Sequence, residues 1–367
     1  MFYPCIIIPI LLISGSSGFN ITYTSNPADL PYSNWMSYFH DINAGDLPMV
    51  PGSHDSATLA VSAQEDWLGI VGWLYAQTQS ATIFNQLMMG VRFLDFRLAV
   101  VLDAFDRSNE IYLSHTFMSN TTLLQGLEAI KNFLDLNPSE FVYLLARVDT
   151  GNPLKTAVRQ KVAFIESIFH QSGLNFANVS SLATTKVKEL AGKVVLIGYT
   201  NQKLLPINTN IPLLNLTAMY SMCDIWEYSS FVTARSRIAS CFPQVPAPML
   251  ETGLLTGYAL DGQFDQLWPN ITSPELNNWW ITNFQNNSDW STRKKYPIGV
   301  FLIDFVNATY MSVLLDFIMN FAYPYPYYGE APEPWTPGAN ITVSNSFELD
   351  GQLIWPLALA CIIQSIV

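Results

Sequence analysis

Short apolar runs alternate with longer amphipathic stretches along most of the chain. The runs are rich in β-branched and aromatic residues and apolar at nearly every position, which is typical of strands buried on both faces of a sheet. Between two of them, residues 123–138 place Leu127, Ile130 and Leu134 at helical spacing, and Pro138 ends the pattern. The apolar runs span residues 47–54, 91–101, 110–116, 140–148, 193–200, 218–227 and 298–306.

This succession of strand, helix and strand predicts parallel strands joined by right-handed crossovers, and hence an α/β fold. Polar or ionisable residues stand at or near the ends of several runs. In a (β/α)8 barrel of the TIM type, the carboxyl ends of the strands converge on one face, where active sites lie. We therefore expect one candidate pocket that contains His54, Asp55, Asp95, Arg97, His115, Arg147, Asp224 and Asp304.

Composition narrows the possible classes of protein. The chain has 367 residues, of which 50% are hydrophobic and 13% charged, so a disordered or collagen-like chain is excluded. The length suits one large α/β barrel or two ordinary domains. With 29 acidic and 17 basic residues the net charge is -12, which would repel a nucleic-acid backbone. We expect no nucleic-acid partner and a monomer.

The beginning of the chain has the pattern of a secretory signal. Residues 1–28 carry no charged side chain, and residues 5–13 form a short apolar block that is followed by small residues up to Gly18. The block is too short to span a bilayer. We predict a signal peptide over residues 1–18; the alternative is a buried first strand.

The end of the chain resembles a signal for a glycosylphosphatidylinositol (GPI) anchor. Small residues at 344–346 precede a polar spacer and an apolar stretch over residues 353–367, which Pro356 interrupts. We predict a catalytic domain over 19–321, a Pro/Tyr-rich linker over 322–346 and a removable anchor signal over 347–367. The alternatives are an ordered last loop, a buried last helix and an unprocessed tail. The ends together predict a secreted or cell-surface protein.

Cysteine and asparagine usage agrees with export. Cys223 and Cys241 are the pair left after the two terminal segments are set aside, so one disulfide is expected, the alternative being two unpaired thiols. N-x-[ST] sequons are about twice as frequent as chance predicts. The candidate glycosylation sites are Asn20, Asn120, Asn178, Asn215, Asn270, Asn286, Asn307 and Asn340.

The ionisable residues at the run ends suit a particular chemistry. The sequence contains 4 histidines, and two of them, His54 and His115, stand near the ends of predicted strands. Two imidazoles, carboxylates to orient them and the guanidinium of Arg97 suit in-line displacement at a phosphodiester, with one His as base and the other as acid. The sequence has no G-x-S-x-G, P-loop, H-E-x-x-H or C-x-x-C motif.

At these residues the chain resembles a known family. The segments LPMVPGSHDSAT, QLMMGVRFLDFRL, IYLSHTF, FLDLNPSEFVYLLARV, GKVVLIGYT and IGVFLIDFVN resemble, in order and spacing, the X domain of bacterial-type phosphatidylinositol-specific phospholipase C. The resemblance runs from about residue 35 to about residue 321. It implies a distorted TIM barrel with a single catalytic domain.

The resemblance also implies roles for individual residues. His54 would be the general base, oriented by Asp304, that takes a proton from the inositol 2-hydroxyl. His115, paired with Asp55, would protonate the departing diacylglycerol, which leaves a 1,2-cyclic inositol phosphate. Arg97 would bind the phosphoryl oxygens, with Asp95 fixing its orientation.

Other residues bear on the metal, the head group and the membrane. Arg97 stands where metal-dependent relatives carry a ligand, so no metal and no cofactor are expected. The resemblance implies Arg147, Asp224 and Trp226 as inositol-binding residues; Tyr199 replaces an arginine of the bacterial relatives, which puts head-group specificity in doubt. Trp67 and Trp73 are candidates for contact with a membrane surface, or else for packing in a helix core.

The leading hypothesis is therefore a secreted, metal-independent phosphodiesterase that acts on phosphatidylinositol or GPI lipid at a membrane surface. One alternative is a metal-dependent phosphodiesterase of the same barrel class that acts on glycerophosphodiesters or sphingomyelin. Another is a catalytically inactive surface protein whose barrel is a binding module.

Overall fold

The protein is described here from a computed structural model. The structure describes residues 31–47, 49–59, 76–100, 110–148, 161–199, 211–216, 219–221, 236, 255–260, 269–286 and 299–321. The predicted signal peptide, the linker over 322–346 and the anchor signal over 347–367 lie outside these ranges.

The strands follow one another around a ring in chain order. Eight parallel strands are joined in the order β7-β6-β5-β2-β1-β10-β9-β8, so the last strand of the sequence pairs with the first. The bounds are β1 Val50–Ser53, β2 Phe93–Val100, β5 Val142–Val148, β6 Val194–Tyr199, β7 Leu214–Leu216, β8 Met219–Ser221, β9 Leu255–Leu260 and β10 Val300–Ile303. Among the described pairings, none joins β7 to β8. The arrangement is that of a distorted TIM barrel, as predicted.

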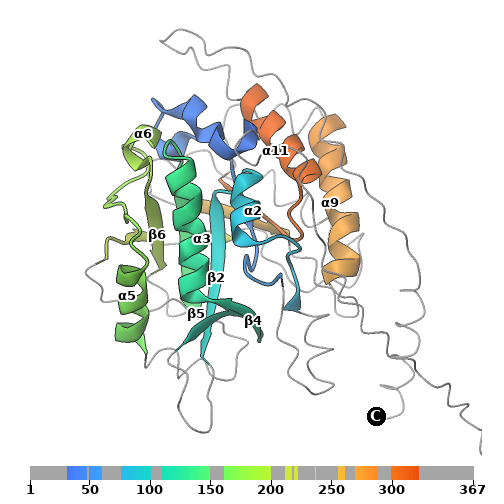
Figure 1. The fold of residues 1–367 in the computed structure, drawn as a ribbon. Helices are drawn as coiled ribbons and strands as arrows, with labels where there is room; N and C mark the ends of the chain where they lie inside the picture. The colour runs from blue at the N-terminus through green and yellow to red at the C-terminus, as the bar shows by residue number, and fades with distance from the viewer. Residues whose placement is uncertain are drawn as a thin grey trace, which may run out of the picture.

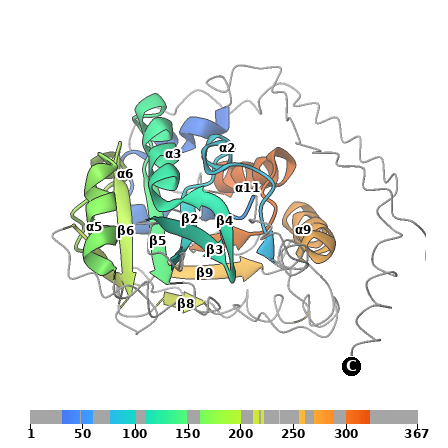
Figure 2. The same ribbon diagram turned by 60° about the horizontal axis from the view of Figure 1, so that its bottom comes forward.

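Helices lie outside the ring of strands. Figure 2 shows α5, α3, α2, α11 and α9 around the strands, and Figure 1 shows the same helices from the side. The bounds are α2 Ile83–Met88, α3 Leu123–Leu136, α5 Val162–Gln171, α6 Val187–Leu190, α9 Pro269–Asn286 and α11 Ala308–Phe321, with 3-10 helices η2 Pro31–Phe39 and η3 Ala44–Asp46. In the part of the chain that the structure describes, no helix is both long and apolar enough to cross a membrane.

Helix α3 forms as its sequence predicts. Thr122 and Gln125 make a reciprocal capping box at its start. Leu127, Ile130 and Leu134 are all buried, as their helical spacing predicts. Gly126 allows the close approach, because a Cβ at this position would lie 3.0 Å from side-chain atoms of both Phe96 and Leu113.

One predicted run differs from a barrel strand. Residues 110–116 contain β3, Ile111–His115, which pairs antiparallel with β2 and with β4, Phe117–Thr122. The reason is that β2 continues past the ring, and its last residues, Leu98 to Val100, pair with β3. β3 therefore runs back along β2 from the carboxyl end of that strand, and His115 follows two residues after Leu113, which is paired with Leu98. The short strands β7 and β9 were not among the predicted runs.

Candidate active site

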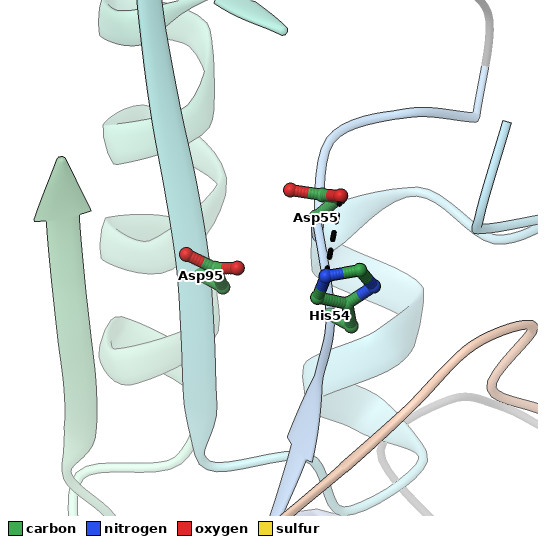
Figure 3. Close-up of side chains that lie close together, drawn as sticks. All are labelled: His54, Asp55 and Asp95. Atoms are coloured by element: carbon green, nitrogen blue, oxygen red, sulfur yellow. Dashed lines mark ion pairs between the residues drawn. The ribbon is translucent and has the colours of Figure 1, made fainter. Parts of the chain in front are cut away.

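The loop after β1 begins the site. The β1 ladder continues for one bond past the strand, where the His54 N–H donates to the Ile303 carbonyl at 3.2 Å. Asp55 then adopts φ 44°, a left-handed conformation that turns the chain away from the strand direction. The Ser56 N–H is tied to the Asp95 carbonyl on β2 at 3.0 Å. Figure 3 shows that His54 and Asp55 project from this loop beside Asp95 on β2.

Positive backbone φ angles mark the site more generally. In the described chain the non-glycine residues with positive φ are Asp55 (44°), Thr116 (61°) and Phe305 (52°). Each is either a candidate site residue or the residue directly after one, since His115 and Asp304 precede the other two. Such conformations cost about 1–3 kcal/mol and concentrate at functional sites.

His54 is held by Asp304 from the far end of the chain. The Nδ1 atom of His54 lies 2.9 Å from Asp304 Oδ1, although 250 residues separate them in sequence. Both side chains are buried. Asp304 is itself fixed by α9, because Ser273 Oγ donates to its Oδ2 at 3.2 Å and Asn277 Nδ2 donates to its backbone carbonyl at 2.9 Å. The pairing that the family resemblance implied is therefore present in the geometry.

Two opposing influences act on the His54 imidazole. Burial lowers its pKa, but the carboxylates of Asp55 and Asp304 outweigh burial and raise the pKa to about 10. The Arg97 guanidinium opposes this rise, and its Nη2 lies 2.6 Å from His54 Nε2. A contact this short fits a neutral ring whose Nε2 accepts from arginine, so protonation requires the guanidinium to move away. The charge of His54 and the position of Arg97 are thus linked.

Asp55 connects three cationic or ionisable side chains. It is buried and forms an ion pair with Arg97 Nε. Its Oδ2 lies 3.3 Å from His115 Nδ1 and 3.4 Å from His54 Nε2. His115 Nδ1 also lies 3.2 Å from the Ala76 carbonyl, so Nδ1 faces two acceptors. The two imidazole rings stand 6.0 Å apart between centroids, with Asp55 in contact with both.

Asp95 contacts Arg97, as expected, but it contacts Arg147 more closely. Its carboxylate accepts two hydrogen bonds from Arg147, at 2.8 Å from Nε and 2.6 Å from Nη2. Arg97 reaches Asp95 only through Nε at 3.4 Å, and its close partner is Asp55. Burial raises the pKa of Asp95, but Arg147 and Arg97 outweigh it and hold that pKa well below its usual range. In the register of β2 and β5, Arg147 lies opposite Arg97, two residues along from Asp95. The Arg147 side chain can therefore reach the Asp95 carboxylate from the neighbouring strand.

Three residues of the site form a group that could hold a cation. Donor atoms of His54, Asp55 and Asp95 all lie within 4.8 Å of one another. The Arg97 guanidinium contacts all three side chains. A metal at this group would have to displace a positive charge that already neutralises the two carboxylates. The residues present therefore fit arginine better than a metal ion.

Several predicted residues receive no structural description. Asp224, Trp226, Trp67, Trp73, Cys223 and Cys241 lie outside the described residues, and Tyr199 is described only as the last residue of β6. The same holds for the sequon residues Asn20 and Asn340, and Asn215, Asn270 and Asn286 have a backbone description only. Asn120 and Asn178 are exposed, and Asn307 begins α11 by accepting the Tyr310 N–H at 2.9 Å.

Sequence reasoning missed the residues that support the site. Ser273 and Asn277 of α9 hold Asp304, and Thr78 and Gln79 contact the His54 loop. None of them is ionisable or at a predicted strand end. Their spacing gives a partial signal: Ser273 and Asn277 are four residues apart and so share one helix face.

Comparison with known proteins agrees with this geometry. Residues 61–199 match the family model described as "Phosphatidylinositol-specific phospholipase C, X domain". This segment contains Asp95, Arg97, His115 and Arg147 but not His54 or Asp304, which the fold brings to it.

Relatives and solved structures extend the similarity. A "1-phosphatidylinositol phosphodiesterase" of Staphylococcus aureus is 26% identical over 190 residues, 51% of this chain and 54% of that protein. A PI-PLC X-box domain-containing protein of Dictyostelium discoideum is 28% identical over 187 residues, 46% of this chain and 23% of that protein. The chain thus spans about half or less of these relatives' lengths.

The solved phosphatidylinositol-specific phospholipase C from Listeria monocytogenes matches with a TM-score of 0.58 and 20% identity, covering 78% of this chain and 98% of that one. At this identity the match concerns the fold. Together, the family model, the relatives and the fold confirm the resemblance expected from the sequence motifs: residues 61–199 are similar to the X domain of phosphatidylinositol-specific phospholipase C, and the fold is similar to that of the bacterial enzyme.

Proposed function

We propose that the protein is a phosphodiesterase that cleaves phosphatidylinositol, or the lipid of GPI anchors, by intramolecular phosphoryl transfer without a metal. The observation that carries this proposal is the pair of imidazoles on either side of Asp55. His54 is paired with Asp304 at 2.9 Å, and His115 lies 3.3 Å from Asp55, with Arg97 in contact with both His54 and Asp55. Such a pair supplies a base and an acid for one displacement.

His54 is the base in this proposal. Asp304 accepts from Nδ1, which leaves Nε2 to take the proton of the inositol 2-hydroxyl. In the ligand-free protein Nε2 is in contact with Arg97. A phosphoryl oxygen would replace Nε2 as the acceptor of the arginine, and the hydroxyl would then reach the base.

Arg97, Asp55 and His115 complete the transfer. The hydroxyl oxygen forms a bond to phosphorus while the bond from phosphorus to the diacylglycerol oxygen breaks, and His115 gives the leaving oxygen its proton. Charge develops on the phosphoryl oxygens, and a guanidinium stabilises such charge with two directed donors. Asp55 contacts both Arg97 and His115, so it holds the phosphoryl-binding group and the acid in one arrangement.

A metal-dependent phosphodiesterase is the second candidate, because the group His54, Asp55 and Asp95 offers three potential ligands. The contacts from Arg97 to all three favour the metal-independent reaction. A chelator separates the two, since only the metal-dependent enzyme loses activity in EDTA.

A lipid surface is the proposed partner, at the outer face of the cell. The acidic chain is expected to attach through aromatic side chains, Trp67 and Trp73, and not through positive charge. While His54 is neutral, the site contains three carboxylates beside two arginines, so the substrate anion relies on Arg97 and Arg147 for positive charge.

The test is incubation of the protein with phosphatidylinositol vesicles in EDTA, followed by phosphorus NMR for a cyclic phosphate. His54→Ala and His115→Ala should each lower the rate by about 10²- to 10⁴-fold. His170→Ala is the matched control, because that ring is largely exposed on α5 and lies outside the site. No cyclic product from the wild type, or more than about a tenth of its rate in either variant, would contradict the proposal. Phosphatidylcholine vesicles test the head group.

A further inference from the structure

A buried glutamine bridges the two loops that carry His54 and Asp304. Gln79 precedes α2 by four residues in the sequence and is fully buried. Its Nε2 donates to the His54 carbonyl at 2.8 Å and to the Ile303 carbonyl at 3.1 Å. Its Oε1 accepts the Val306 N–H at 3.1 Å. One side chain thus fastens the backbone at His54 and on both sides of Asp304.

The strand ladder alone does not fix these loops. The pairing of β1 with β10 ends at Ser53 and Ile303, and one further bond joins the His54 N–H to Ile303. Phe305 then turns away with φ 52°. Past this point Gln79 supplies the bonds that a continued ladder would have made.

The preceding residue strengthens this bridge. The Thr78 carbonyl accepts the Phe305 N–H at 2.6 Å, and Thr78 Oγ1 donates to the His54 carbonyl at 3.2 Å. Thr78 is also buried and hydrogen-bonded to Thr58 at 2.6 Å, so the segment is anchored to the turn after Asp55. Loops held at this many points have little freedom to separate.

We propose that Gln79 is a positioning residue that sets the contact between the His54 imidazole and the Asp304 carboxylate. It acts through the two backbones and does not touch the reacting atoms. The kinetic consequence rests on the proposed function, whereas the positioning itself does not. Misplacement of a catalytic group by about 1 Å can cost about 10²-fold in rate.

The experiment compares two buried glutamines. Gln79→Met keeps the size of the side chain but removes its hydrogen bonds. Gln86→Met is the matched control: Gln86 is also fully buried and donates from Nε2 to two carbonyls, of Ser56 at 2.8 Å and Ala81 at 2.7 Å, but it does not reach the Asp304 loop. We expect kcat of Gln79→Met to fall about 10²-fold with KM within about threefold, and kcat of Gln86→Met to stay within about tenfold of wild type.

A second measurement needs no turnover. Nitrogen NMR of the imidazoles, assigned with His54→Ala, reports the Nδ1 proton and the titration of His54. Gln79→Met should weaken the Nδ1 hydrogen bond and lower the pKa of His54, whereas Gln86→Met should leave both as in wild type. If Gln79→Met does not fold, Gln79→Glu retains the acceptor oxygen and loses the amide donors.

The outcomes separate the two proposals. A wild type without phosphodiesterase activity counts against the proposed function, and the NMR comparison still tests the position of His54. Wild-type kcat and an unchanged Nδ1 signal in Gln79→Met would overturn the role of Gln79. Equal changes in both glutamine variants would overturn it too, because they would indicate a general packing effect.

Discussion

Two arginines, one directly before β2 and one within its second half, have different surroundings. Arg92, directly before the strand, is fully buried, whereas the Arg97 side chain is 17% exposed near the other end. Arg92 donates to Glu140 through Nε at 2.8 Å and Nη2 at 2.6 Å, and to backbone carbonyls from Nη1 and Nη2. Those carbonyls belong to Leu87, Val91, Ser33 and Tyr32. Its guanidinium also lies 4.6 Å from the ring centroid of Phe133.

The difference lies in the kind of partner. A guanidinium has five N–H donors, and the partners of Arg92 satisfy all of its nitrogens with groups that do not titrate, apart from one carboxylate. Burial lowers the pKa of Arg92, and Glu140 opposes that shift. Arg97 contacts Asp55, Asp95 and His54, and its side chain is partly exposed, so a ligand anion could take the place of one of these contacts. Arg92 joins η2, α2 and Glu140, which precedes β5, whereas Arg97 joins the ionisable residues of the candidate site.

The largest expected effect comes from Arg97→Lys. A lysine keeps the charge but cannot reproduce two directed donors on phosphoryl oxygens while it pairs with Asp55. We expect kcat/KM to fall about 10³-fold with little change in thermal stability, measured with phosphatidylinositol vesicles and by calorimetry. If kcat/KM of Arg97→Lys stayed within about tenfold of wild type, the two directed donors of Arg97 would not be needed for activity.

Arg92→Met should have the opposite signature. It leaves Glu140 charged and buried without its cation, which typically costs about 3–5 kcal/mol of unfolding free energy. The folded fraction should keep its kcat, because Arg92 lies at the other end of the barrel from the site. Adding Glu140→Gln should recover part of the stability, as urea unfolding would measure. An Arg92→Met variant with normal stability but low kcat would contradict this prediction, because Arg92 would then act in the reaction and not in the fold.

Much of this comparison could be predicted from the sequence. The apolar runs located β1, β2, β5, β6 and β10, and residues at their ends gave the ionisable members of the site. Such runs are predictable because a strand buried on both faces has few polar positions.

The remaining features depend on pairing between distant segments. Arg92 lies in the same motif as Asp95 and Arg97, yet its role is visible only once Glu140 is beside it. Asp95 was expected to contact Arg97, and it does, but the register of β2 and β5 brings Arg147 to it as a second and closer partner. Ser273, Asn277 and Gln79 are neutral polar residues whose importance comes from buried hydrogen bonds that form only in the folded chain. Periodicity and charge carry no signal for such contacts.

The charge of His54 predicts how stability depends on pH. Its folded pKa is raised to about 10, above the usual value of 6.5, so once the Arg97 guanidinium has moved off Nε2 the folded protein retains a proton that the unfolded chain releases. The contribution to stability is complete below about pH 6.5 and is lost as the pH rises toward about 10, by up to about 1.4 kcal/mol per pH unit. Since the same proton must leave before His54 acts as a base, kcat/KM should rise over this range.

Urea unfolding at several pH values checks this prediction. His54→Asn should flatten the decline, and His170→Ala should leave it unchanged. Parallel curves for wild type and His54→Asn would indicate a neutral imidazole, held so by the contact from Arg97 Nη2. This result would mean that the Arg97 guanidinium, and not the carboxylates of Asp55 and Asp304, determines the protonation state of His54.

The smallest effect is expected for Ser273→Ala. Its hydroxyl donates to Asp304 Oδ2 at 3.2 Å, a longer contact than the one from His54 Nδ1 to Oδ1, so it supports the carboxylate without setting its position alone. Asn277 continues to hold the Asp304 backbone from the same helix. Loss of one hydrogen bond to a charged group costs about 1.5–3 kcal/mol at most, and part of it should appear as a fall of about threefold to tenfold in kcat. Steady-state kinetics should find KM nearly unchanged, because Ser273 contacts the residue that orients the base and not the substrate. Asn277→Ala provides the comparison: if both variants lowered stability equally and neither altered kcat, α9 would support Asp304 only as part of the fold, as Arg92 supports the other end of the barrel.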